Sequence, residues 1–224
     1  MKKKELLRSV IGQLNWLCTQ TRPDGSYNVL ELSNMLKHST VREILQANKT
    51  FKKLKLEECV IKFTSLGEPE DMKLVVFSDA SHANLPDGHS SGAGFIIFLM
   101  GKEGKCCPLV WEAKKIKKVV KSRLAVETRA LMEALDMGMY LSDTLTELFF
   151  MGTPGKKVPV ECYVDNVHST KSVTKKQLKI DLASIKHMVE NKAVSKLNLI
   201  GANLQLSDCF TKSDAGTRHA LRVS

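Results

Sequence analysis

The chain has 224 residues, 43% of them hydrophobic and 26% charged, a composition typical of a soluble globular protein that excludes a largely disordered one. Its formal net charge of +10 favours a polyanionic partner, and nucleic acid is the commonest of these. No apolar run has the length that a bilayer-spanning helix needs, so we expect no membrane association.

The six cysteines form neither a Cys-x-x-Cys pair nor a zinc-ligand spacing with histidine. Several lie in apolar, strand-like runs, where a free cysteine acts as a small hydrophobic residue. The basic first residues lead into an amphipathic stretch, unlike the uniformly apolar run of a signal peptide. We therefore expect reduced, structural thiols in an intracellular protein, and the sequence leaves cytoplasm and nucleus equally open.

The first third of the chain has the periodicity of amphipathic helices. Apolar residues recur at helical spacing over 6–17, and the turn at 22–25 ends this predicted helix. A second stretch has apolar residues between Val29 and Leu36, and a third runs from Thr40 to about Leu54. In the third, Thr40 is the expected N-cap, with Glu43 three residues later as in a capping box.

A polar segment that contains Gly and Pro, residues 65–71, predicts a linker. We place a domain boundary near Gly67, which divides the chain into a helical segment, 1–67, and a second domain, 68–224. The second domain is predicted to contain five strands, at Lys73–Ser78, Ala93–Leu99, Pro108–Trp111, Val158–Val164 and Lys196–Gly201. Helices are expected from Ser122 to about Tyr140, over about Lys175–Asn191, and from near Ser207. This order predicts an α/β domain with one mixed five-stranded sheet flanked by helices.

Four acidic residues occupy positions at which their carboxylates could meet. Asp79 and Asp165 each follow an apolar strand, at the edge where ligands bind in open α/β sheets. Glu127 lies on the long predicted helix, at the border of its buried face. Asp208 stands at the start of the last predicted helix, where the helix dipole favours a carboxylate. Each acid alone is most often a turn, cap or solvated residue, and only their joint placement favours a shared site.

Converging carboxylates repel one another and raise each other's pKa unless cations join them. Mg²⁺ prefers oxygen ligands, and two such ions about 4 Å apart can activate a water and stabilise the leaving oxygen of a phosphodiester. We therefore predict that the four acids are catalytic residues that bind two Mg²⁺ ions, with Mn²⁺ as a substitute. They are Asp79, which would bridge both ions, and Glu127, Asp165 and Asp208.

Several short segments, taken in order, resemble one known family. They are Ser78-Asp79-Ala80-Ser81, residues 121–128, Tyr163-Val164-Asp165-Asn166, Lys179-Ile180-Asp181 and residues 205–212. Together they resemble the ribonuclease H domain of copia-type retrotransposon Pol polyproteins. The segments 8–14 and 21–24 resemble the part of these polyproteins that joins reverse transcriptase to ribonuclease H, so the resemblance covers almost the whole chain.

The resemblance implies a ribonuclease H-like fold over 68–224, preceded over 1–67 by a helical connection segment from the C-terminal part of a reverse transcriptase. It also implies a metal-dependent endonuclease that hydrolyses the RNA strand of RNA–DNA hybrids, with the same four acids in its active site. The polymerase part of such a polyprotein is a further expected partner. One departure is the loop 201–205, which lacks the histidine that cellular ribonucleases H often carry before the last acid.

Nine lysines in two clusters are candidates for contacts with the phosphates of a hybrid. One cluster precedes the long helix and the other follows the fourth strand: Lys114, Lys115, Lys117, Lys118 and Lys121, and Lys171, Lys175, Lys176 and Lys179. Such contacts give salt-dependent binding with little sequence preference, while groove shape and 2′-hydroxyls identify a hybrid. A solvated charged face is the alternative for both clusters.

The sequence leaves other functions open. The domain could be a catalytically idle or co-opted module that binds nucleic acid or protein, although all four acids are present. Another nuclease of the same fold, such as a resolvase or transposase, would share the strand acids, but Glu127 and the lack of a long insertion favour ribonuclease H. Polymerase activity is excluded because Asn166 stands where a polymerase hairpin needs a second carboxylate. Trp111 is expected in the core, and His82 and Asn84 are expected to be ordinary loop residues.

Overall fold

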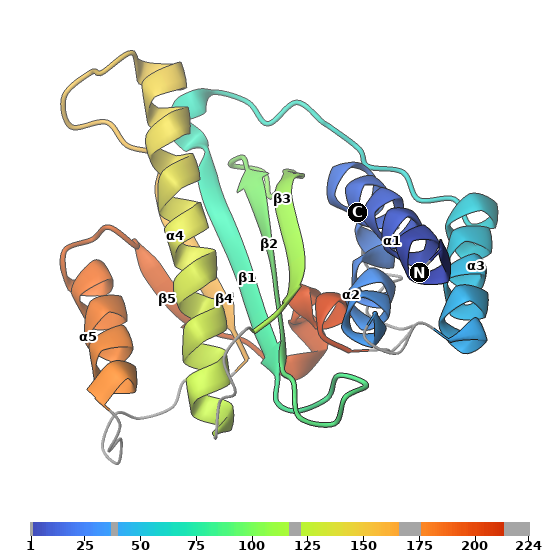
Figure 1. Cartoon of the computed structure of the whole chain (residues 1–224). Coiled ribbons are helices and arrows are strands. Elements are labelled where there is room, and N and C mark those ends of the chain that lie inside the picture. The colour runs from blue at the N-terminus through green and yellow to red at the C-terminus, as the bar shows by residue number, and fades with distance from the viewer. Residues whose placement is uncertain (1, 37–39, 117–121, 166–175, 213–224) are drawn as a thin grey trace.

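The computed structural model describes residues 2–36, 40–116, 122–165 and 176–212 (Figure 1). Its helices are α1 (Lys2–Gln20), α2 (Ser26–Met35), α3 (Val41–Leu56), α4 (Arg123–Phe150) and α5 (Lys176–Glu190). Its strands are β1 (Lys73–Ser81), β2 (Gly92–Met100), β3 (Cys106–Lys115), β4 (Val160–Val164) and β5 (Lys196–Leu199), and a short 3-10 helix, η5 (Leu206–Phe210), comes after β5. None of the helices in these ranges is both long and apolar enough to cross a membrane.

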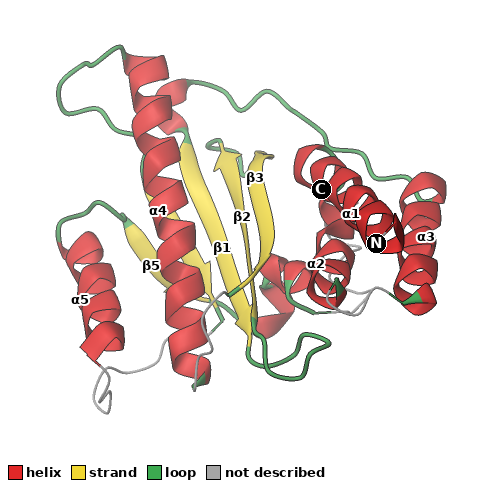
Figure 2. Cartoon of the chain, viewed as in Figure 1, coloured by secondary structure: helices red, strands yellow, loops and turns green. Residues whose placement is uncertain are grey.

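The five strands form one mixed sheet in the order β3-β2-β1-β4-β5 (Figure 2). β2 is antiparallel to both β1 and β3, whereas β4 is parallel to both β1 and β5. Short turns can join antiparallel neighbours, while the parallel strands need the longer crossovers that contain α4 and α5. This order and these directions confirm the predicted ribonuclease H-like fold, a mixed five-stranded sheet flanked by helices.

Strand alternation divides the core into two layers. Successive side chains of a strand point to opposite faces, so Leu74 of β1 packs on the side of α4, and Val75 packs on the other side with Trp111 and Phe210. Trp111 is thus a core residue, as predicted. Phe210 belongs to η5, which covers the face of the sheet opposite α4. By the same alternation, Asp79 shares the η5 face with Val75.

The three N-terminal helices have a core of their own and also pack on the sheet. Buried side chains of α1, α2 and α3, among them Leu7 and Leu32, form one cluster. Trp111 Nε1 donates a hydrogen bond of 2.7 Å to the Cys18 carbonyl oxygen, which joins α1 to the edge strand β3. The domain boundary near Gly67 stays a prediction.

The predicted elements are present, and their ends differ for local reasons. α3 begins after the predicted capping box, in which the Thr40 amide donates to Glu43 Oε2 at 2.6 Å. β1 continues through Asp79 to Ser81, because its pairing with β2 extends that far. The predicted end of β1 before Asp79 is therefore wrong.

Other elements also differ in length from the prediction. β4 begins at Val160 rather than at Val158, and β5 ends at Leu199 rather than at Gly201. α4 continues past the predicted end near Tyr140 to Phe150, because side chains such as Leu145 keep an apolar face on the core. β3 is longer than predicted at both ends and reaches Lys115. Within the described residues, the predicted last helix is only the five-residue 3-10 helix η5, with Asp208 in its middle. Asp208 lies in the first turn of η5, and the predicted contribution of a helix dipole at this residue stays a prediction.

All six cysteines lie within the described residues and are free thiols, as predicted. Burial raises the pKa of the Cys18 and Cys162 thiols to about 12. A thiol of that pKa stays protonated and unreactive at neutral pH, so these two side chains act as packing residues.

Candidate metal centre

Asp79 lies inside β1, at the position where two neighbouring strands define the site. It pairs in register with Gly94 of β2, and two more strand residues follow it. On its other side, β1 is parallel to β4. The carboxyl ends of β1 and β4 therefore meet at one edge, which is the usual ligand-binding position of an open α/β sheet.

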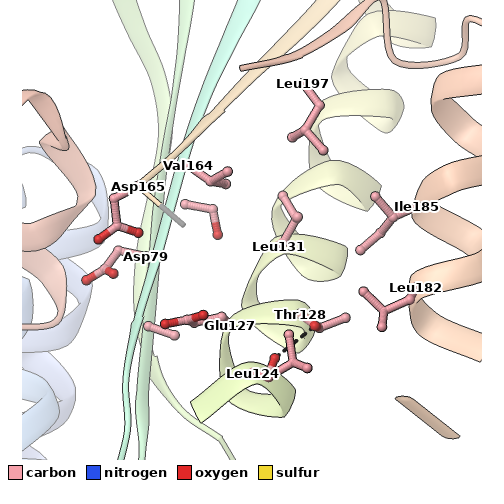
Figure 3. Close-up of a pocket in the computed structure, with 12 residues that line it drawn as sticks. Asp79, Leu124, Glu127, Thr128, Leu131, Val164, Asp165, Leu182, Ile185 and Leu197 are labelled. Carbon is pink, nitrogen blue, oxygen red and sulfur yellow. Dashed lines mark hydrogen bonds between the residues drawn. The ribbon is translucent and has the colours of Figure 1, made fainter. Parts of the chain in front are cut away.

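The structure brings three of the four predicted acids together. Asp165 directly follows β4, and Figure 3 shows its carboxylate beside that of Asp79. Asp208 comes from η5, on the face of the sheet that Asp79 shares. One carboxylate oxygen from each residue lies within 4.8 Å of the other two. Such a set of three carboxylates could hold a metal ion.

Burial sets the electrostatics of Asp79, whose side chain is only 4% exposed. Burial is the largest cause that raises the pKa of Asp79, to about 7. A hydrogen bond from the Thr211 hydroxyl and the charge of Lys212 oppose the rise, whereas the Asp208 and Asp165 carboxylates add to it. Without a further cation, Asp79 is therefore about half protonated at neutral pH.

Lys212 supplies one positive charge to the site. Its Nζ atom lies 2.7 Å from Asp208 Oδ1 and 3.9 Å from Asp79 Oδ2. Burial acts to lower the pKa of Lys212, but the hydrogen bond to Asp208 and the nearby carboxylates raise it above its ordinary value. The ammonium group thus occupies a position to which three carboxylates attract a cation.

Gln205 fixes the start of the segment that carries Asp208. The Gln205 side chain is 1% exposed, and its Nε2 donates to the Ser78 carbonyl oxygen at 3.1 Å. Its Oε1 accepts a hydrogen bond of 2.8 Å from the Ser207 hydroxyl. The residue before Asp79 and the residue before Asp208 are thereby joined through one buried amide.

Thr211 fixes the end of the same segment. Its hydroxyl donates to Asp79 Oδ2, and its carbonyl oxygen accepts a hydrogen bond of 2.7 Å from Asn84 Nδ2. Asn84 therefore supports the site indirectly, although the sequence suggested an ordinary loop residue. For His82, the expectation of an ordinary loop residue stays a prediction.

Gly94 gives η5 the space to approach the sheet. A Cβ atom at Gly94 would lie 2.4 Å from the Cβ atom of Phe210, which is closer than real side chains come. Phe210 is fully buried and cannot move aside without opening the core. A glycine opposite Asp79 is thus what lets η5 carry Asp208 to the site.

Glu127, the fourth predicted acid, lies beside the three-carboxylate group but outside it. The N-cap Ser122, whose side chain accepts from the Ala125 amide, starts α4 so that Glu127 falls in the second turn. The Glu127 side chain is 13% exposed, and its Oε1 accepts a hydrogen bond of 2.7 Å from Arg123 Nε. Its role as a metal ligand stays a prediction.

A pocket between the sheet, α4 and α5 adjoins the acids (Figure 3). Asp79, Glu127 and Asp165 lie at one end of it. The remaining wall is largely apolar and includes Leu124, Leu131, Val164, Leu182, Ile185 and Leu197. Glu127 thus shares a cavity with two of the three grouped acids, which keeps it within the candidate site.

The predicted phosphate-binding lysines differ in their surroundings. Lys114 forms an ion pair with Glu133 at 3.0 Å. Lys115 forms one with Asp87, also at 3.0 Å. Lys176 and Lys179 are exposed on α5, whereas Lys117, Lys118, Lys121, Lys171 and Lys175 lie outside the described residues.

The donor set fits an oxygen-preferring divalent cation. The three carboxylates come from β1, from the end of β4 and from η5, all of which are held by strand pairing or buried hydrogen bonds. The raised pKa of Asp79 and the position of Lys212 both indicate a site that positive charge stabilises. Sequence reasoning did not single out Gln205, Thr211 or Lys212 as site residues, although all three belong to the run 205–212.

The chain is similar in sequence to transposon Pol polyproteins, although no family model matches it. Two Arabidopsis thaliana proteins are similar to it, the retrovirus-related Pol polyproteins from transposon RE1 (31% identity over 212 residues) and from transposon RE2 (28% over 221 residues). Each alignment covers 92% of this chain, and the chain spans only 14% of either relative. A crystal structure of LC11-RNase H1 in complex with an RNA/DNA hybrid is similar over 62% of this chain and 94% of that chain, with 20% identity and a TM-score of 0.41.

The similarity in sequence extends from the N-terminal helices through the domain that carries the acids, since it covers 92% of the chain. The sheet order and strand directions agree with the fold that the resemblance implied. The chain therefore contains a ribonuclease H-like domain and is related to the Pol polyproteins of copia-type retrotransposons.

Proposed function

We propose that this chain is a metal-dependent endonuclease that hydrolyses the RNA strand of RNA–DNA hybrids. The observation that carries the proposal is the convergence of Asp79, Asp165 and Asp208, with one oxygen of each within 4.8 Å of the others. The relation to retrotransposon Pol polyproteins supports the substrate class. The whole polyprotein's activities are not carried over, because the chain spans 14% of those relatives.

Asp79 is the centre of the proposed mechanism. Divalent cations, when bound, would supply Lewis-acid activation of a water and charge stabilisation at the leaving 3′ oxygen. Asp79, Asp165 and Asp208 would hold these cations, because Asp165 and Asp208 approach Asp79 from β4 and from η5. The Thr211 hydroxyl keeps the Asp79 carboxylate in one orientation by donating to Oδ2.

Glu127 and Lys212 have supporting roles in this proposal. Glu127 lines the same pocket as Asp79 and would leave its ion pair with Arg123 to complete the set of ligands. Lys212 balances the charge of the acids and would exchange that role for contact with a substrate phosphate. The exposed Lys176 and Lys179 on α5 would hold the backbone of the hybrid next to the acids.

The test is cleavage of hybrids with a label on either strand, in Mg²⁺ and in chelator. The parent chain should cut only the RNA strand and only with the divalent ion, while Asp79→Asn and Asp208→Asn should not cut. Asp143→Asn is the matched control, because that carboxylate is 71% exposed on α4 and pairs with Lys157. It should cut like the parent.

Two results would count against the proposal. Cutting of a DNA–DNA duplex as fast as the hybrid would assign a different nuclease. No cutting by a folded parent that still binds the hybrid would favour a non-catalytic binding module. A Glu127→Gln variant that cuts like the parent would remove Glu127, and not the other three acids, from the site.

A further inference from the structure

The positive charge of the chain is concentrated in its N-terminal helices. Residues 1–56 contain eleven Lys and Arg against four Asp and Glu, whereas the whole chain has 34 against 24. These first helices therefore carry +7 of the formal net charge of +10. Neither of the two lysine clusters predicted to bind phosphates lies in this part of the chain.

One side of α3 collects these charges. Arg42, Lys49, Lys52 and Lys53 lie within about 100° of one another around the helix axis, given 3.6 residues per turn. Arg42, Lys49 and Lys52 are exposed and line one shallow surface depression, together with Gln46. These four cations are called the α3 basic face below.

One cation of the α3 basic face has a nearby acid, since the charge of Arg42 contributes to lowering the pKa of the Glu43 carboxylate. The only acid of α3 is Glu43, whose carboxylate accepts from Thr40 in the capping box. Among the described residues, no ion pair joins a carboxylate to Lys49, Lys52 or Lys53. Elsewhere most described lysines are paired: Lys73 and Lys196 with Glu161, Lys102 with Asp71, Lys114 with Glu133, Lys115 with Asp87, Lys156 with Glu70, Lys157 with Asp143 and Lys186 with Glu190.

We propose that the α3 basic face is a second nucleic-acid-binding surface, which binds the phosphate backbone of a duplex outside the candidate active site. A cluster of cations on one helix side, in which the three lysines have no ion pair among the described residues, fits a polyanion with regularly spaced charges. In Figure 1 the first turn of α3 lies on the same side of the molecule as the C-terminal end of β1, where the acids converge. A duplex that extends from the acids along this side would meet the first turn of α3, where Arg42 lies.

An anionic membrane surface is the alternative occupant, because basic amphipathic helices also bind lipids. Such a helix inserts a continuous apolar side into the lipid, but the apolar side of α3 already packs against the other N-terminal helices. Ala47 and Leu54 are buried against α1 and α2 in the cluster of the N-terminal helices. Four large apolar side chains of α3 are also exposed, Val41, Leu45, Phe51 and Leu56. Lys49 and Lys52 lie between Leu45 and Leu56 along the helix, and Phe51 lies on another side of it, so the four do not form a continuous apolar stripe. The structure thus favours the duplex.

The proposal takes the nature of the duplex, an RNA–DNA hybrid, from the proposed function, but its test needs no catalysis. Binding of a fluorescent hybrid is measured in chelator at several salt concentrations, with the parent and with the triple variant Arg42→Gln/Lys49→Gln/Lys52→Gln. The variant should bind at least about tenfold more weakly. A plot of the logarithm of the binding constant against the logarithm of the salt concentration has a negative slope. The magnitude of this slope should decrease by about 3 in the variant, close to one unit for each phosphate that it no longer neutralises.

Two matched variants separate this site from a general charge effect. The triple variant Lys102→Gln/Lys105→Gln/Lys186→Gln removes the same charge from exposed, ion-paired lysines and should bind like the parent. Lys49→Arg/Lys52→Arg keeps the charge and should also bind like the parent. Glutamine is a good helix former, so circular dichroism should report an intact α3 in the first variant.

Several results would overturn the proposal. They are an equal loss of affinity in both triple variants, no loss in the α3 variant, or binding of the parent to phosphatidylserine vesicles but not to the hybrid. A failure of the proposed function looks different, because a chain without ribonuclease activity would still lose hybrid affinity when the α3 basic face is neutralised. Conversely, Asp79→Asn should lose cleavage and keep this binding.

Discussion

The Lys212 ammonium lies 2.7 Å from Asp208 Oδ1, four residues away along the chain, and 3.9 Å from Asp79 Oδ2. Since three carboxylates converge there, this lysine offsets repulsion that would otherwise disfavour the folded chain when no metal is bound. The same position makes Lys212 a competitor of a bound cation.

Replacement of Lys212 by methionine should therefore lower the melting temperature in chelator and enlarge the increase that Mg²⁺ produces. We expect a loss of about 1 kcal/mol, or roughly 2–4 °C for a chain of this size, because the side chain is 43% exposed and solvent screens the pair. Thermal melts with and without Mg²⁺ measure both effects. Lys186→Met breaks an exposed pair of the same spacing with Glu190 and should change neither value.

Asp79 gives the chain without metal a defined pH dependence. Its folded pKa is raised to about 7 by burial, so between pH 4 and 7 the folded state binds more protons at this group than the unfolded state does. This group therefore lowers stability as pH rises over that interval, and its effect is constant above about pH 7.

Asp79→Asn should remove this penalty and make the metal-free chain more stable than the parent at pH 8. It should also abolish the stabilisation by Mg²⁺, which in the parent should grow as pH rises towards 8 because Asp79 must lose its proton to bind. Urea unfolding at pH 5 and pH 8, with Mg²⁺ or chelator, measures these changes. A parent whose stabilisation by Mg²⁺ does not depend on pH would contradict the argument.

The sequence was sufficient for the order of the strands and helices and for placing Asp79 and Asp165 at one edge, because both follow from local patterns. Apolar runs of strand length predicted the strands, and parallel neighbours bring Asp79 and Asp165 to one edge. The end of β1 was predicted too early, since its length depends on pairing with Gly92 of β2. Gln205 and Thr211 were missed because their partners, such as the Ser78 carbonyl oxygen, are far away in sequence.

Gly94 supplies a prediction about the supports of the site. Alanine at this position would place a Cβ atom 2.4 Å from the Cβ of Phe210, so η5 must move and carry Asp208 with it. Gly94→Ala should cost about 1–3 kcal/mol and reduce both the stabilisation by Mg²⁺ and any cleavage. Gly12→Ala is the control, since a Cβ at Gly12 of α1 meets no atom within 4 Å. That change should stabilise the chain by up to about 1 kcal/mol.

The two predicted lysine clusters should respond differently to substitution. Lys115 Nζ lies 3.0 Å from Asp87 Oδ2 and 2.6 Å from Asn34 Oδ1, so it links the loop after β1 to α2. Burial acts to raise the pKa of Asp87, but hydrogen bonds from Ser90, Lys115 and the His89 amide hold it well below its ordinary value. The Asp87 carboxylate therefore stabilises the fold at neutral pH, and this contribution is lost in strong acid.

Lys115→Gln should consequently lower the melting temperature while changing hybrid affinity little. Lys179→Gln, on the exposed side of α5, should weaken hybrid binding and leave the melting temperature unchanged. Binding isotherms in chelator and thermal melts on both variants measure the contrast. The opposite result is that Lys115→Gln lowers the affinity for the hybrid as much as Lys179→Gln does and leaves the melting temperature unchanged. In that case Lys115 leaves its partners to contact the phosphates, and its ion pair with Asp87 contributes little to the stability of the fold.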